Sequence, residues 1–401
     1  MRRLLAALLV SAVSICSQAK TNGVVRLSLL ASDAPPSFQR HGTGLQRFND
    51  DTVALSQALV SYSSDVYHDW RLHAVVNGYS DGERKAGISQ LYAEYRPLSA
   101  AQWKPSVKVG AFYPALSVEN TTTGWLSPHF LSNSAINSWI GEEVRTGGAE
   151  FSLRRPGRQA RSLYSWSLHG GMFKGNDTTA TLISWRGFAL HDRQSLYNDR
   201  IHFPRWPGVV SQEAIGAPAW TEPFHEIDGR WGWYAGAHML YRRTVDLRYY
   251  YYDNRANPTA ITPERLYGWH TRFHSLSFRQ FISSQWQWYA QVLTGSTLMG
   301  EEVVNNDFHA AYAALSYLTG KHRVSARADW FQVVDNDDFQ SDRNASAGYG
   351  VTANYQYQVS SAVSLSGELQ YVESGADNRV LINQARTHSE TLLQLAVTFT
   401  F

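Results

Sequence analysis

Charged side chains at every second position of otherwise apolar runs are the first sign of chemistry in this sequence. Asp246 is followed by Arg248, and Arg327 is followed by Asp329. In an extended strand alternate side chains point to the same face, so these acids and bases would form a ladder on one face. The ladder can be a set of structural ion pairs. Alternatively, it can select ions through the sign and placement of its charges.

Catalytic and metal chemistry have weaker support. The chain has 14 histidines, but none lies in a recognisable nucleophile motif, and the G-x-S-x-G, H-E-x-x-H, Walker and dinucleotide patterns are missing. Residues 335–338, Asp-Asn-Asp-Asp, offer oxygen ligands suited to calcium, without the glycine and spaced glutamate of a calcium loop. We interpret them as a solvated acidic loop. We predict no enzyme, no metal and no cofactor, and keep a hydrolase built on His with Ser or Asp as an alternative.

The elements that must position the charges are strands with a period of two. In the last twelve residues Leu393, Leu395, Val397, Phe399 and Phe401 alternate with small or polar residues. Runs of this kind are about ten to thirteen residues long, which is enough to cross a membrane at a tilt. They recur near 71–77, 107–113, 245–252, 285–292, 323–330, 351–358 and 363–371.

The connections between runs alternate between short and long. Short ones lie near 241–243, 281–283, 319–321 and 359–361, and long ones near 254–266, 296–306, 334–346 and 375–389. This predicts an all-β fold, a transmembrane antiparallel β-barrel of about 16 strands (14–18 possible) counted from about residue 52 to 401. The visible strands do not place 114–141 and 188–227 on the same side, which predicts a missed strand pair or an inward-folded segment. A barrel of this size leaves an aqueous channel.

The amino terminus and the composition agree with this reading. Residues 1–19 read as a secretory signal peptide with two arginines, an apolar core and a cleavage site after Ala19, leaving a single domain over 20–401. Removing Arg2 and Arg3 from the 36 bases leaves 34 against 34 acids, so a nucleic-acid partner has no electrostatic support. Mature segments are too short and polar for a helical membrane protein, whereas 14 Trp and 22 Tyr fit aromatic girdles at a membrane surface.

In layout the chain resembles the Gram-negative porins, and loosely the phosphate-selective porin O/P group. The matching features are the signal peptide, the terminal Phe401 and the segment 108–114 (Lys-Val-Gly-Ala-Phe-Tyr-Pro), followed by 116–119 and a helix-prone stretch at 132–139. The resemblance implies that this region folds into the barrel and narrows it, and that Phe401 is read by the barrel-assembly machinery. Phosphate-selective members use basic residues there, whereas residues 114–141 contain no Lys or Arg.

We therefore choose 114–141, with the residues just after it, as the candidate constriction loop; the alternative is an external loop packed on itself. We interpret 188–227, which includes His191, Asp192 and Arg193, as an external lid. The candidate constriction residues are Glu119, Trp125, His129, Glu142, Glu143 and Arg145. The expected pore-lining residues are Arg71, Arg96, Lys108, Arg154, Arg248, Arg272, Arg327, Glu94, Asp246, Asp329 and Glu368.

The resulting hypothesis is a porin of the Gram-negative outer membrane, a passive diffusion channel for small hydrophilic solutes and ions with a possible weak anion preference. Its expected partners are outer-membrane lipid and lipopolysaccharide, the assembly machinery, and two further copies in a homotrimer. A channel specific for one solute, a phosphate-like anion or a sugar, and an outer-membrane hydrolase remain the alternatives.

Overall fold

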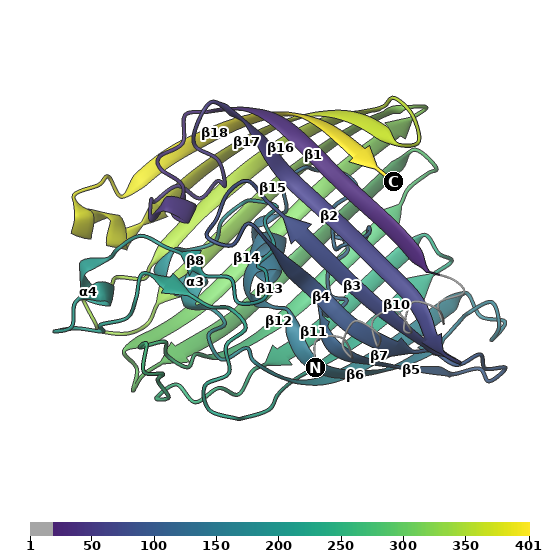
Figure 1. Cartoon of the computed structure of the whole chain (residues 1–401), viewed down its shortest axis with the longest axis horizontal. Helices are drawn as coiled ribbons and strands as arrows, with labels where there is room; N and C mark the ends of the chain where they lie inside the picture. Colours follow the sequence, from purple (N-terminus) through teal and green to yellow (C-terminus); the bar gives the residue numbers. More distant parts are fainter. Residues whose placement is uncertain (1–18) are drawn as a thin grey trace, which may run out of the picture.

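Sixteen antiparallel strands close into one barrel (Figure 1). The computed structural model describes residues 19–401, so the predicted signal peptide lies outside the described residues except for Ala19. The barrel strands are β1 (Lys20–Ser32), β2 (Thr52–Tyr67), β3 (Trp70–Gly78), β4 (Ala86–Tyr95), β5 (Lys104–Phe112), β6 (Thr146–Arg155), β7 (Tyr164–Lys174), β10 (Gly232–Tyr241), β11 (Val245–Asp253), β12 (His270–Phe281), β13 (Trp286–Met299), β14 (Val304–Thr319), β15 (His322–Asp335), β16 (Ser346–Gln358), β17 (Val363–Ala376) and β18 (Thr387–Thr400).

The first and last strands close the barrel. β1 pairs with β18 in a register that sets Leu27 beside Val397 and Leu29 beside Leu395. The seam extends to the last residue, because the Gly23 N–H donates to the Phe401 carbonyl oxygen at 2.8 Å and the Phe401 N–H donates to the Gly23 carbonyl at 3.1 Å. Closure leaves no unpaired strand edge, which a barrel in lipid requires.

The predicted number of sixteen strands is confirmed, but one strand was placed wrongly. Only fifteen barrel strands lie after residue 52, and the sixteenth is β1, before the predicted start. Its alternation of Leu27, Ser28 and Leu29 is interrupted at Leu30, which shortens the pattern. The structure also shows how 114–141 and 188–227 lie at the same end of the barrel, which the strands visible in the sequence did not allow. The hairpin of β6 and β7 lies between these two stretches.

The two faces of the wall differ in polarity. Leu395 and Val351 point outward and are 48% and 50% exposed, whereas their neighbours Gln394 and Thr352 point inward and are buried. An apolar outer band around a polar interior is the reverse of a soluble protein and is the arrangement that a bilayer requires. Among residues 19–401, no helix is long and apolar enough to span a membrane.

Long and short connections gather at opposite ends (Figure 1). The short ones share their end with the carboxyl terminus, and the long ones include η1 (Phe38–Arg40), η2 (Asp377–Ile382) and the small sheet of β8 (Ile201–His202) and β9 (Trp220–Thr221). The prediction of a long connection at 296–306 is wrong, because only residues 300–303 separate β13 from β14. The polar residues that suggested a loop belong to β14, where Asn306 faces the interior and is fully buried.

Candidate functional site

The connection from β5 to β6, residues 113–145, folds into the barrel. Its inner part forms helix α2 (Ala135–Glu143), which begins where the Ser134 hydroxyl accepts a hydrogen bond from the Asn137 N–H. All nine residues of α2 are buried, and the helix packs against the inner faces of β14 and β15. The buried stretch runs continuously from His129 to Thr146.

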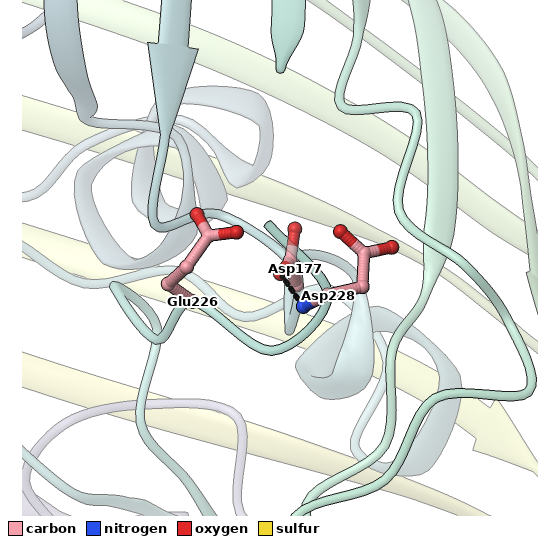
Figure 2. Close-up of side chains that lie close together, drawn as sticks. All are labelled: Asp177, Glu226 and Asp228. Carbon is pink, nitrogen blue, oxygen red and sulfur yellow. Dashed lines mark hydrogen bonds between the residues drawn. The ribbon is translucent and has the colours of Figure 1, made fainter. Parts of the chain in front are cut away.

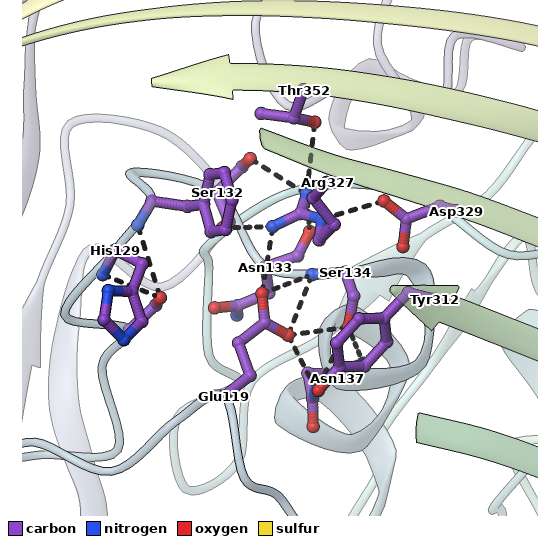
Figure 3. Close-up of polar contacts among 12 residues, drawn as sticks. Glu119, His129, Ser132, Asn133, Ser134, Asn137, Tyr312, Arg327, Asp329 and Thr352 are labelled. Carbon is purple, nitrogen blue, oxygen red and sulfur yellow. Dashed lines mark hydrogen bonds and ion pairs between the residues drawn. The ribbon is translucent and has the colours of Figure 1, made fainter. Parts of the chain in front are cut away.

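Arg327 of β15 holds this segment to the wall (Figure 3). Its guanidinium donates to Glu119 at 2.9 Å and to Asp329 at 2.8 Å, and all three side chains are fully buried. It also donates to the backbone carbonyls of Ser132 at 3.0 Å and Asn133 at 2.9 Å. A buried guanidinium needs this many acceptors, since an unpaired charge in such surroundings costs several kcal/mol.

Carboxylates of the wall complete the attachment by accepting from backbone N–H groups of the segment. Asp329 accepts from Ala135 at 3.0 Å, at the start of α2 where a negative charge is favourable. Glu368 of β17 accepts from Leu131 at 2.6 Å and from Ser132 at 2.9 Å. The segment is thus fixed by charged groups on two strands of the wall.

A second inserted segment, the connection from β7 to β10 (175–231), packs on the first. Residues 176–196 are all buried and include helix α3 (Thr181–Trp185). The later part carries α4 (Pro207–Val210) at the end of the molecule where the long connections lie (Figure 1). Arg186 joins the two segments through a bidentate contact with Glu142, at 2.8 and 2.6 Å. The predicted external lid is therefore wrong for its first residues, because His191, Asp192 and Arg193 lie in the interior.

Adjacent carboxyl groups in α2 have opposite electrostatic settings. Glu142 contacts Arg186 and His191, and although burial opposes ionisation, these partners lower its pKa to about 2. Glu143 has no ion-pair partner within the described chain; burial raises its pKa to about 8, against donation from the Trp139 indole N–H and the Leu182 N–H. Glu142 is therefore an anion at neutral pH, and Glu143 is largely protonated.

A third group of charges joins the connection between β1 and β2 to the interior. Asp192 contacts Arg26 of β1 at 3.3 Å and Arg47 at 2.6 Å. Arg47 also contacts Asp81 at 2.5 Å, and Arg193 contacts Asp199 at 2.9 Å. Bases and acids therefore alternate through this part of the interior, and each of the buried bases has an acidic partner.

Two cavities lie on either side of the inserted segments. One of about 800 Å³ is bordered by the carboxyl terminus and the short connection at 359–362, and its inner limit includes Arg26 and Leu131. Arg26 contacts Asp192, which with Glu368 lines a second cavity of only about 10 Å³. The other large one, of about 590 Å³, lies among the long connections and is lined by charged residues such as Arg84, Lys85 and Glu222.

Three acids at the end with the long connections, Asp177, Glu226 and Asp228, lie close enough together to hold a cation (Figure 2). Backbone N–H groups already engage them: Asp177 accepts from Ile227 at 2.6 Å, and Glu226 accepts from Gly175 and Gly229, both at 2.7 Å. Burial raises the pKa of Asp177 to about 6. We interpret the cluster as structural, with its carboxylates holding the surrounding connections through backbone hydrogen bonds. In the acidic loop at 335–338, Asp337 is engaged in the same way by the Asn305 and Phe339 N–H groups.

The expected constriction residues lie in or beside the first inserted segment. Glu119, Glu142, Glu143 and Arg145 are fully or almost fully buried in the interior. Arg145 donates to the Ser195 carbonyl at 2.8 Å, which adds a contact between the two segments. His129 is buried against Gln287, and the Trp125 ring stacks on Tyr113 with 4.4 Å between ring centroids.

The expected pore-lining residues fall into three groups. Lys108, Arg248, Arg327, Glu94, Asp246, Asp329 and Glu368 are on the inward face of the wall, and Arg71 and Arg154 are on the same face but exposed at the rim. Arg96 lies beyond the end of β4, in the short connection. The prediction that Arg272 lines the pore is wrong. Its side chain points outward and donates to Ser296, because Phe273 takes the inward position and packs against Trp139.

Sequence reasoning missed Arg26, Arg47 and Glu390 as interior residues. Glu390 of β18 accepts from the Leu45 N–H at 2.8 Å and from the Gln46 N–H at 2.9 Å, and so anchors the connection that carries Arg47. A signal existed for Arg26, which precedes Leu27 and Leu29 in alternation. No local pattern indicated Arg47, because it lies in the connection between β1 and β2 and its acidic partners, Asp81 and Asp192, are distant in the chain.

Solved structures with the same fold are outer-membrane proteins, although the sequences have diverged. The outer membrane channel DcaP of Acinetobacter baumannii is 10% identical, with 96% of this chain and 97% of that one aligned and a TM-score of 0.57. The trimer form of OmpT from Vibrio cholerae is 9% identical (96% and 99%, TM-score 0.54), and the anion-selective porin from Comamonas acidovorans is also 9% identical (96% and 99%, TM-score 0.52).

No family model matches the sequence, and a search of curated proteins finds no significant match. At these identities the structural likeness establishes the fold. The chain is therefore an outer-membrane-type barrel with the sixteen-stranded fold of the porins.

Proposed function

We propose that this barrel is a channel of the Gram-negative outer membrane that lets small hydrophilic solutes and ions diffuse down their gradients. The observation that carries the proposal is a closed wall, apolar outside and polar inside, with cavities of about 800 and 590 Å³ on the two sides of an interior filled by charged, hydrogen-bonded segments. A polar interior occurs in barrels with a water-filled channel and in plugged barrels, and the cavities on the two sides of the inserted segments favour the channel.

The inserted segments would act as the constriction. Most inward-facing side chains near α2 are buried, so a solute that passes must travel through a narrow polar route where each charge acts strongly. The wall beside Arg26 and Asp192 is the candidate route, because the large cavity ends there and the small one begins. Since Arg26 and Arg47 are paired with Asp192, we expect weak ion selectivity and no strong preference for phosphate.

Replacing Asp192 by asparagine should shift the channel towards anions. The change leaves Arg26 without its acidic partner, whereas Arg47 keeps Asp81, so one unpaired cationic group would face the route. Reversal potential under a salt gradient measures the shift. The control is Asp50→Asn, which removes an exposed partner of Arg40 at the rim. Equal reversal potentials for the two variants would show that the route lies elsewhere.

Two alternatives remain. A channel specific for one solute would show saturable block of its current by that solute. A hydrolase would need a nucleophile and base such as Ser152 and His169, which lie 2.8 Å apart on the interior wall. There Glu150 contacts Ser152 and approaches the same ring nitrogen, instead of orienting the histidine from its other nitrogen. Ester turnover that disappears in Ser152→Ala would favour the hydrolase.

For assembly we propose a homotrimer, with Phe401 read by the barrel-assembly machinery and the outer band in contact with lipid and lipopolysaccharide. Support comes from the solved trimer form of OmpT, from the exposed ring of Phe401 at the seam, and from the apolar outer face. Light scattering of the folded protein in detergent distinguishes a trimer from a monomer.

Swelling of vesicles that contain the folded protein tests permeation. Vesicles should swell in uncharged solutes at rates that fall steeply with solute size, because the interior is narrow. Vesicles that swell no faster than protein-free ones would contradict the proposal.

A further inference from the structure

The cavity of about 800 Å³ beside the carboxyl terminus has the properties of a binding site. Its volume lies within the range of roughly 300–1,000 Å³ that small-molecule sites occupy. The inward faces of β1, β16, β17 and β18 form its wall, and residues 122–131 of the first inserted segment form its floor.

The lining is unusual in its chemistry because neutral polar groups dominate it. It contains the amides of Asn22, Asn354, Gln356 and Gln358 together with eight Ser and Thr residues. Among these lining residues, all in the described part of the chain, there is no aspartate or glutamate. Amides and hydroxyls can both donate and accept hydrogen bonds, which suits a partner that does the same.

The two ionisable side chains that line the cavity, Arg26 and His129, carry no free charge. Arg26 is paired with Asp192 and donates to the Leu131 carbonyl, both at 3.3 Å. Burial lowers the pKa of His129 to about 3, so this side chain is uncharged at neutral pH. The carboxyl terminus lies at the rim, where the Gly23 N–H donates to a Phe401 oxygen at 2.8 Å.

The floor of the cavity is tied to the wall beside it. Asn354 is 4% exposed, and its amide nitrogen donates to the His129 carbonyl at 2.7 Å. Its Oδ1 has no hydrogen-bond partner, but this atom is buried and does not face the cavity. Apolar surface for the carbon side of a ligand is present as well, from Leu126 and Phe130.

We propose that this cavity binds a neutral polyhydroxylated solute of the size of a small sugar. The hydroxyl groups of such a solute would exchange hydrogen bonds with the amides of Gln356 and Gln358, while its C–H faces would lie on Phe130 and Leu126. A charged solute would find no unpaired counterion among the lining side chains. The biological role of this binding rests on the proposed channel function. The binding itself requires no conduction.

Equilibrium dialysis of radiolabelled sucrose against the protein folded in detergent tests the site. We expect saturable binding at one site per chain, and competition by unlabelled sucrose but not by gluconate or glucosamine at equal concentration. Gln356→Leu and Gln358→Leu should each weaken binding about tenfold, the effect of one lost hydrogen bond. Both side chains are only partly buried, so we expect both variants to fold.

The matched control is Asn306→Leu, because Asn306 also carries an inward-facing amide, but it lies on β14 and does not line the cavity. The assignment is overturned if sucrose does not bind, if a charged analogue competes as well as sucrose does, or if Asn306→Leu weakens binding as much as Gln356→Leu. Sucrose binding without any ion conductance would instead contradict the channel and leave the site standing. Conductance without sucrose binding would do the reverse.

Discussion

Replacing Arg327 by methionine should destabilise the barrel by about 3–5 kcal/mol and raise its conductance. Methionine keeps much of the volume but leaves Glu119 and Asp329 as two neighbouring buried carboxylates with no base between them. Removing one partner of a buried ion pair typically costs this much. The conductance should rise because Arg327 also holds the Ser132 and Asn133 carbonyls, so the first inserted segment loses its main attachment. Urea unfolding and single-channel recording measure the two effects.

A matched pair of variants separates charge pairing from general damage. Arg71→Met removes an exposed arginine that contacts Asp65 at the rim, and should leave both readouts unchanged. Adding Glu119→Gln to Arg327→Met should recover part of the lost stability, since it removes one of the two unpaired charges. If Arg327→Met is no less stable than Arg71→Met, the buried network does not anchor the segment.

Replacing Glu143 by glutamine should stabilise the protein at pH 8 and above, whereas replacing Glu142 by glutamine should destabilise it at neutral pH. Because the pKa of Glu143 in the folded chain, about 8, lies above the ordinary value of 4.5, the folded state binds a proton that the unfolded state has lost. Stability therefore decreases as the pH rises from about 4.5 to 8. Each unit of this shift corresponds to about 1.4 kcal/mol, so the effect amounts to a few kcal/mol.

Glu142 has the opposite effect on the pH dependence of stability. The pKa of Glu142 is lowered to about 2 by Arg186 and His191, so its contribution is present at neutral pH and is lost only as the pH falls towards 2. Glu142→Gln removes it and leaves Arg186 buried without a counterion. Thermal unfolding from pH 5 to 9 tests both: the curve for Glu143→Gln should be flatter than that for the wild type. Parallel curves would mean that Glu143 is ionised throughout.

The fold could be predicted because alternation is local and the bilayer enforces it. Val351 and Thr352 have opposite environments in the structure, as their types predict, and the same holds for Trp330 and Asp329. Arg272 shows where the rule fails. Near the end of a barrel the outer face is no longer in hydrocarbon, so an arginine can face outward while Phe273 fills the interior.

The site could be predicted only in part, because its contacts join distant parts of the chain. The length and composition of 114–141 indicated a segment folded inward, and Glu119 and Arg327 were each identified as candidates. Their contact spans 208 residues, and no local pattern encodes it. The interior position of Asp192 was missed for the same reason, since its partners Arg26 and Arg47 lie in another region of the sequence.

Single-channel recording of the refolded protein in a planar bilayer tests the central claim most directly. The account predicts stable open steps of small conductance, because the inserted segments fill most of the interior. It also predicts a reversal potential near zero under a salt gradient, because Arg26 and Arg47 beside the candidate route are paired with Asp192. Protein shown to be folded and inserted that gives no steps would contradict the channel. The hydrolase would then be the account to test.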